Sequence, residues 1–143
     1  MICYEGAFLM FIAQTSIGFI EIPNHISLNV YAVGCEHRCP GCCNNKLQDF
    51  DYPHRFWLDD DQFKVVLSNA TLVDSVCWLG GDASFQLERL IQLSTIVREY
   101  FPAKINCLYT GNLFEHLSDP LKDVLDVVVD GKRIKQKAEA PRL

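Results

Sequence analysis

The sequence has little positive charge and no long apolar segment. Its 143 residues carry a net charge of -5, and no Lys or Arg precedes Arg38. Direct nucleic-acid binders usually carry a basic surface, so this balance argues against such a partner. The longest apolar run, Gly6–Ala13, is too short to span a bilayer. It also lacks the basic flank of a secretory signal, and neither end carries a lipidation motif. We therefore expect a cytoplasmic protein with no membrane partner.

The cysteines do not follow the pattern of a disulfide framework. There are seven of them, an odd number, and a chain of this length can bury a core without covalent cross-links. With 49% hydrophobic and 22% charged residues, the composition is that of an ordinary folded domain. No internal repeat is visible. We expect a single domain over residues 1–143, in which the basic segment 132–143 is an exposed tail.

Apolar runs alternate with helical periodicities along the chain. We expect strands at residues 8–14, 18–22, 26–33, 75–79, 105–109 and 126–129, and helices at 59–70, 85–100 and 113–117, with another turn after Pro120. This alternation predicts a parallel sheet with crossover helices. Four or five parallel strands are too few to close an eight-stranded barrel. The expected fold class is therefore α/β, an open partial (βα) barrel of mostly parallel strands.

Residues that could bind a ligand or a metal follow the ends of these strands. They are Cys35, Gly80, Gly81, Asp82, Thr110 and Asp130. Ligand sites in parallel sheets and barrels lie at the carboxyl ends of the strands. We therefore expect one site at this edge, although Asp130 fits a structural or solvent-facing role better.

The cysteine-rich loop has the spacing of a metal or iron–sulfur site. Cys35, Cys39 and Cys42 form a Cys-x3-Cys-x2-Cys pattern. Three thiolates on a tight loop can hold three corners of a cuboidal iron–sulfur cluster and leave the fourth iron open. The alternative is a zinc site that uses three cysteines with His37 or Cys43. Zinc sites usually pair two such knuckles a dozen or more residues apart, and no second knuckle is present.

The loop resembles a known family. Its pattern Gly-Cys-x-His-x-Cys-Pro-Gly-Cys-x-Asn, at residues 34–44, is similar to the cluster loop of radical S-adenosylmethionine (SAM) enzymes. More narrowly, it resembles activating proteins of the anaerobic, class III ribonucleotide reductase. Segments 78–82, 108–111 and 127–132 are similar to later motifs of that family, and the resemblance spans residues 11–132. The chain departs from the family at Cys43, often aromatic there, and at Ala83, often Pro.

The resemblance implies two cofactors and the residues that hold them. A 4Fe–4S cluster is expected on Cys35, Cys39 and Cys42, with SAM on the open iron. SAM contacts are expected from Gly41, Cys43, Gly80, Gly81, Asp82 and Thr110. The two glycines of the Gly-Gly-Asp motif would permit close backbone approach, and the aspartate would accept a hydrogen bond from the SAM ammonium. Taken alone, the motif fits a strand-to-helix turn with an N-cap equally well.

The implied activity is that of an oxidoreductase with no catalytic side chain beyond the cluster and SAM. Reductive cleavage of SAM to a 5′-deoxyadenosyl radical would generate a glycyl radical on the partner, the anaerobic ribonucleotide reductase. An electron donor such as a flavodoxin is the second expected partner. The alternatives are an activase of another glycyl radical enzyme, a small radical SAM modifying enzyme, and a non-catalytic zinc or iron–sulfur interaction module.

Overall fold

A six-stranded sheet forms the centre of the computed structural model, which describes residues 9–19, 21–35 and 45–130. The strands, in the order in which they lie in the sheet, are β3 (Phe56–Asp59), β1 (Leu9–Gly18), β2 (Ser27–Ala32), β4 (Ser75–Gly80), β5 (Ile105–Tyr109) and β6 (Val127–Val129). β2, β4, β5 and β6 pair in parallel, whereas β1 pairs antiparallel with both β2 and β3. This confirms the α/β class and the parallel sheet expected from the sequence.

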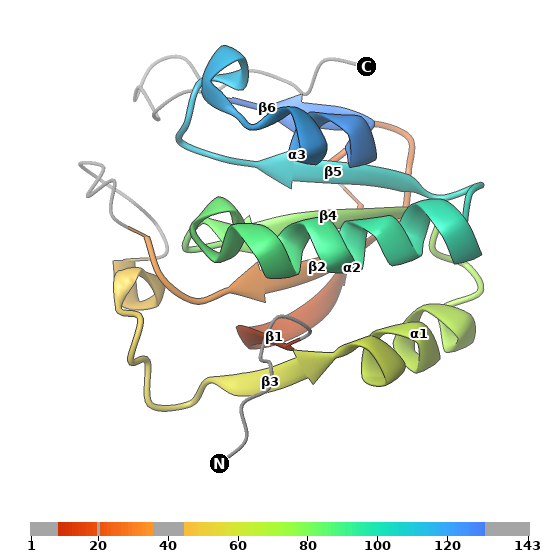
Figure 1. The fold of residues 1–143 in the computed structure, drawn as a ribbon. Coiled ribbons are helices and arrows are strands. Elements are labelled where there is room, and N and C mark those ends of the chain that lie inside the picture. The colour runs from red at the N-terminus through yellow and green to blue at the C-terminus, as the bar shows by residue number, and fades with distance from the viewer. Residues whose placement is uncertain (1–8, 20, 36–44, 131–143) are drawn as a thin grey trace.

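Three α-helices cover one face of the sheet, and Figure 1 shows them on the near side. They are α1 (Asp60–Asn69), α2 (Leu87–Tyr100) and α3 (Asp119–Val124). Short 3-10 helices precede or follow them: η2 (Asn45–Gln48), η3 (Ala83–Gln86) and η4 (Phe114–His116). The main core lies between this face and the helices, where Phe63 and Trp78 are fully buried. No described helix is long and apolar enough to cross a membrane.

The connection between β1 and β2 covers part of the opposite face of the sheet. Ile22 of this connection packs on Cys77, Cys107 and Val127. The Tyr109 hydroxyl donates a 2.6 Å hydrogen bond to the Glu21 carbonyl. We call residues 21–26 the cross-sheet segment.

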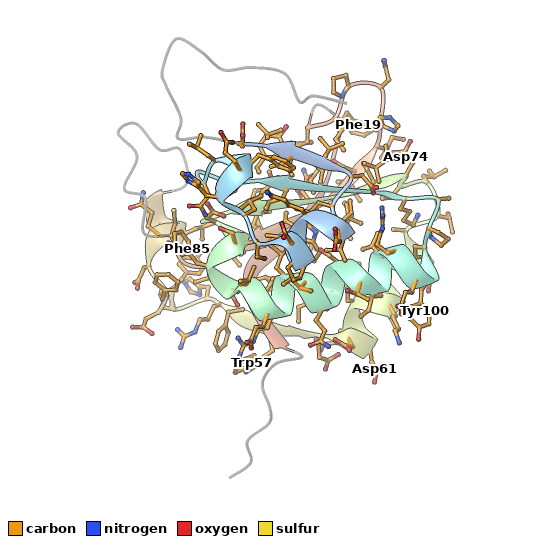
Figure 2. The ribbon with its side chains drawn as sticks, turned by 45° about the horizontal axis from the view of Figure 1, so that its top comes forward. Phe19, Trp57, Asp61, Asp74, Phe85 and Tyr100 are labelled. Carbon is orange, nitrogen blue, oxygen red and sulfur yellow. The ribbon has the colours of Figure 1, made fainter. Side chains whose placement is uncertain are left out.

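Asp74 holds the far end of the cross-sheet segment. Its carboxylate accepts a hydrogen bond from the Ile26 amide and lies 3.0 Å from Nδ1 of His25. The Asp74 amide in turn donates to the Ile26 carbonyl. Figure 2 shows Asp74 at the opposite end of the sheet from Phe85. Asp74 therefore holds one end of the cross-sheet segment, and the hydrogen bond from Tyr109 to Glu21 holds the other.

The described elements differ from the expected ones in four places. The strand expected at 18–22 is wrong: β1 continues to Gly18 through a bulge between Ile12 and Gln14, and the apolar Ile22 is buried in a bend rather than a strand. β3 was not expected, because its Phe56 and Trp57 are both exposed at the sheet edge and give no alternation. The helix expected at 85–100 begins as η3, and the one at 113–117 is the 3-10 helix η4.

Candidate functional site

Cys35 lies at the carboxyl end of β2, where the sequence places the start of the cysteine loop. Its side chain is only 7% exposed. The next described residues are those of η2, so Cys39, Gly41, Cys42 and Cys43 lie outside the described residues. Cys77 and Cys107 lie elsewhere, paired in register under the cross-sheet segment. The hydrogen bond between Cys107 and Cys77, together with burial, raises the pKa of the Cys107 thiol.

Backbone hydrogen bonds join the two ends of the cysteine loop. The Gly34 amide donates to the Leu47 carbonyl over 2.7 Å, and the Cys35 amide donates to the Gln48 carbonyl over 3.2 Å. We call these four residues the loop base. Gly34 has φ +100°, and a Cβ there would lie 2.2 Å from the Phe50 ring. Glycine is therefore required at the entrance to the loop by both conformation and space.

The Gly80-Gly81 turn after β4 packs directly against this base. Gly80 has φ +99°, and a Cβ on it would lie 2.5 Å from the Ala32 carbonyl oxygen. A Cβ on Gly81 would lie 2.6 Å from the carbonyl oxygens of both Gly34 and Leu47. The sequence suggested that these glycines admit a cofactor. In the structure, the backbone that approaches them closely is that of β2 and the loop base.

The Asp82 carboxylate is buried, with 1% of the residue exposed, and accepts hydrogen bonds from its own chain. One oxygen accepts from the Ser84 amide (3.0 Å) and hydroxyl (2.7 Å). The other accepts from the Thr110 hydroxyl (2.8 Å) and the Gly111 amide (2.9 Å). The Asp82 amide itself donates to the Gly34 carbonyl. Asp82 therefore caps η3 and joins the ends of β2, β4 and β5.

Two of the polar residues beside Asp82 were not expected from the sequence. The Asn112 side-chain amide donates to the Ser84 hydroxyl over 2.9 Å, and the Asn112 backbone amide donates to the Thr110 hydroxyl over 3.1 Å. Thr110 is 7% exposed, whereas Ser84 and Asn112 are half-buried. We call Asp82, Ser84, Thr110 and Asn112 the polar cluster. No local pattern around Ser84 or Asn112 distinguishes them from ordinary turn residues.

Gln86 is a further residue that the sequence did not single out. Its side-chain oxygen accepts from the Phe11 amide, and its nitrogen donates to the carbonyls of Phe11 and Val33 at 2.9 and 3.1 Å. Val33 directly precedes the loop base. Gln86 therefore fixes β1 and the end of β2 to the helix that follows the Gly-Gly-Asp turn.

Comparison with known proteins identifies relatives of this chain. The family model described as "4Fe-4S single cluster domain" matches residues 26–143. Over 117 residues, the chain is also 30% identical to the anaerobic ribonucleoside-triphosphate reductase-activating protein of Vibrio cholerae serotype O1, covering 77% of this chain and 76% of that protein. The chain belongs to this family of 4Fe–4S activating proteins. The match confirms the resemblance to radical SAM activating proteins that the motifs predicted.

A solved structure supports the fold of this activating-protein family member. The crystal structure of QueE from Escherichia coli is similar, with a TM-score of 0.56 and 10% sequence identity. The match covers 73% of this chain and 53% of QueE, so the chain spans about half the length of that structure. At this identity the likeness concerns the fold alone, and it agrees with the expected partial barrel.

The described part of the site fits an iron–sulfur ligand loop. Cys35 is buried, and the hydrogen bonds of the loop base hold the chain in place on both sides of the loop. A soft thiolate is the side chain that iron–sulfur clusters require. Gly34, Cys35 and Leu47 of the loop base are buried against the Gly-Gly turn, so the first cysteine is fixed to the scaffold.

Proposed function

We propose that this protein is a radical SAM activase that generates a glycyl radical on an anaerobic ribonucleotide reductase. The observation that carries the proposal is the position of Cys35, which starts a Cys-x3-Cys-x2-Cys loop whose ends are hydrogen-bonded at the carboxyl edge of the parallel strands. Cys35, Cys39 and Cys42 would hold the 4Fe–4S cluster. The similarity to the Vibrio cholerae activating protein supports the same activity.

The residues of the chain bind and orient the cofactors rather than react. When bound, the cluster and SAM together supply a carbon radical strong enough to take hydrogen from a glycine Cα. Gly80 and Gly81 hold the loop base against β2 and β4 by allowing close backbone contact. Asp82 and Thr110 fix the ends of β4 and β5 beside it. Gly41 and Cys43 remain predicted SAM contacts.

Apolar side chains around the edge favour a protein substrate. Phe50, which follows η2, is 43% exposed, and Leu113 and Phe114, which follow β5, are 45% and 44% exposed. They come from two sides of the site, near the loop base and near the polar cluster. Exposed apolar side chains that flank a site are typical of protein-binding surfaces. We propose the reductase as this partner and a flavodoxin-type protein as the electron donor.

Anaerobic reconstitution tests the cluster assignment. Wild-type protein should take up about four iron and four sulfide per chain, as a 4Fe–4S cluster requires. Cys35→Ala should lose most of this iron, because one of three ligands is missing. Cys77→Ala is the matched control, since Cys77 is buried on the other face and should leave iron uptake unchanged. Equal iron uptake in all three proteins would contradict the assignment of Cys35.

Turnover and radical transfer test the activity. Reduced, reconstituted protein should convert SAM to 5′-deoxyadenosine, and a glycyl-radical EPR doublet should appear on a co-incubated anaerobic ribonucleotide reductase. A doublet only on another glycyl radical enzyme would favour the alternative activase. A colourless protein with one zinc per chain and no SAM cleavage would instead indicate a non-catalytic interaction module.

A further inference from the structure

The hydrogen bonds of the polar cluster have a fixed direction from donor to acceptor. Ser84 and Thr110 each have one hydroxyl proton, and both hydroxyls lie within 2.8 Å of an Asp82 carboxylate oxygen. An ionised carboxylate only accepts hydrogen bonds, so both protons are directed to Asp82. The two hydroxyl oxygens are then left as acceptors. They accept from the Asn112 side chain and backbone, respectively.

This direction of donation also fixes the Asn112 carboxamide. The Ser84 hydroxyl already donates its one hydrogen bond to Asp82, so its oxygen can only accept from the carboxamide. The nitrogen end of the carboxamide must therefore face it, which is the orientation observed at 2.9 Å. The carbonyl Oδ1 of Asn112 therefore points away from Ser84. Asp82 and Thr110 are buried, whereas Asn112 is partly exposed at the end of β5. Asn112 is therefore the member that presents an acceptor to a ligand.

The electrostatics of the cluster favour a cationic donor. The Asp82 carboxylate places a negative charge beneath the two hydroxyls, whose protons point inward to it. The side of the cluster that faces away from Asp82 therefore presents hydrogen-bond acceptors, and the buried carboxylate adds a negative charge behind them. A primary ammonium carries both the positive charge and the N–H donors that match such a surface. The sulfonium of SAM is cationic but has no N–H to donate.

We propose that Asn112 binds the ammonium of SAM through its side-chain oxygen, and that Asp82 is a positioning residue that orients Asn112 through Ser84 and Thr110. The inference rests on the proposed function, because it takes SAM as the ligand of this edge. It differs from the role that the resemblance gives Asp82, in which the aspartate itself contacts SAM. The sequence motif marks the positioning residue, and the contact residue lies 30 positions further along the chain.

Equilibrium binding to the anaerobically reconstituted full chain tests the contact. Three probes separate the groups: SAM, S-adenosylhomocysteine, which keeps the ammonium but lacks the sulfonium, and 5′-methylthioadenosine, which lacks the amino-acid part. Asn112→Ala should raise Kd for the first two by about tenfold, the size expected for one hydrogen bond to a charged group. Its Kd for 5′-methylthioadenosine should not change. Asn69→Ala, an exposed asparagine at the end of α1, is the matched control.

A double-mutant cycle tests the positioning role of Asp82. If Asp82 acts through Asn112, the doubly substituted protein D82N/N112A should bind S-adenosylhomocysteine no more weakly than Asp82→Asn alone. Additive losses would show that Asp82 contacts the ligand itself and would overturn the inference. Iron content and thermal stability are measured for every variant, and because Asn112→Ala leaves the Asp82 hydrogen bonds intact, it should fold even if Asp82→Asn does not.

The outcomes distinguish this inference from the proposed function. Unchanged binding of S-adenosylhomocysteine to Asn112→Ala, or an equal loss for 5′-methylthioadenosine, would overturn the Asn112 contact while the activase proposal stands. Wild-type protein that carries its cluster but binds neither SAM nor S-adenosylhomocysteine would overturn both.

Discussion

Gly34, Gly80 and Gly81 lie where β2, the loop base and the turn after β4 pack closely together. Each lacks a side chain at a position where a Cβ would meet other atoms at 2.6 Å or less. At Gly80 and Gly81 the atoms in the way are backbone atoms, which cannot rotate aside as a side chain can. These residues therefore set how closely the loop base approaches the sheet.

Gly81→Ala should separate the loop base from the end of β4. The added Cβ would lie 2.6 Å from two carbonyl oxygens, so Gly34 or Leu47 must move. Overpacking of this kind costs about 1–3 kcal/mol, which lowers Tm by several degrees in a domain of this size. Thermal unfolding followed by circular dichroism measures the change.

Gly18→Ala is the control for this substitution. A Cβ there meets the ends of the Glu21 and Asn29 side chains, which can rotate away. A smaller loss of Tm is therefore expected. A loss as large as that of Gly81→Ala would show that backbone contact at the loop base is not what makes Gly81 necessary.

Asp60 should make stability depend on pH. Burial raises the pKa of this carboxyl, an effect that Lys64 partly opposes, and its Oδ1 is buried without a hydrogen-bond partner among the described residues. The folded state therefore binds the proton more tightly than the unfolded state. Stability falls as pH rises from the ordinary pKa of the carboxyl through its raised value.

Asp60→Asn should accordingly raise Tm at neutral pH and give no gain below about pH 3, where the carboxyl is protonated in both states. Asp61→Asn is the matched control, because it removes an exposed charge from the same helical turn. Thermal melts across the pH range measure both. If Tm depends on pH in the same way for both variants, burial of Asp60 is not the cause of the pH dependence.

At the scale of elements, η3 connects parts of the chain that are far apart in sequence. Gln86, at its end, bonds to Phe11 on β1 and to Val33 beyond β2. Gln86→Glu keeps the acceptor for the Phe11 amide but turns the other oxygen toward two carbonyl oxygens. We expect a loss of about 2 kcal/mol or more in the free energy of unfolding, measured by urea denaturation. Gln92→Glu on α2 should cost much less, and an equal loss would argue against the bridging role.

The cross-sheet segment depends on Tyr109. Burial raises the pKa of the Tyr109 phenol, so it remains a donor to the Glu21 carbonyl at neutral pH. Tyr109→Phe removes this bond and should speed amide exchange in residues 21–26. Tyr100→Phe, at an exposed position at the end of α2 (Figure 2), should leave exchange there unchanged. Unaltered exchange in Tyr109→Phe would show that Ile22 and Asp74 alone hold the segment.

Elements with strong local signals were predictable, and those set by tertiary contacts were not. Asp59 begins α1 with a reciprocal pair of hydrogen bonds to Gln62, and the sequence placed the helix start there. β3 is different: Leu58 is buried, but Phe56 and Trp57 are exposed, and Trp57 stacks on Phe11 of the neighbouring strand. Pairing with β1, which local sequence does not encode, makes this stretch a strand.

At the scale of the whole molecule, the candidate site also combines residues with local sequence signals and residues placed only by tertiary contacts. The cysteine spacing and the Gly-Gly-Asp motif predicted one site at the carboxyl edge of the strands, and the structure brings the loop base, Gly81 and Asp82 together at that edge. The contacts of Gln86, Ser84 and Asn112 join segments separated by 28 to 75 residues, so no local sequence pattern could predict them. Four predicted ligand or SAM-contact residues, Cys39, Gly41, Cys42 and Cys43, lie outside the described residues, so their roles remain predictions.

The arrangement of helices predicts where a partner binds. α1, α2 and α3 cover one face of the sheet (Figure 1). Phe50, Leu113 and Phe114 are exposed near the loop base and the polar cluster. Binding of the reductase should therefore slow amide exchange at residues 80–86 and 110–114. The outer surface of α2 is the internal control. Protection confined to α2 would contradict docking at the strand ends.

The hydrogen bonds between Gly34 and Leu47 and between Cys35 and Gln48 give the intervening residues two fixed attachment points on the scaffold. Because the scaffold fixes both ends, a longer chain between them adds a loop-closure cost to the folding free energy of about 0.6 kcal/mol for each doubling. Different spacings or sequences can therefore be exchanged between the same two attachment points with little penalty to the sheet. The chemistry of this protein and its folding stability are, to that extent, separately adjustable by evolution and by design.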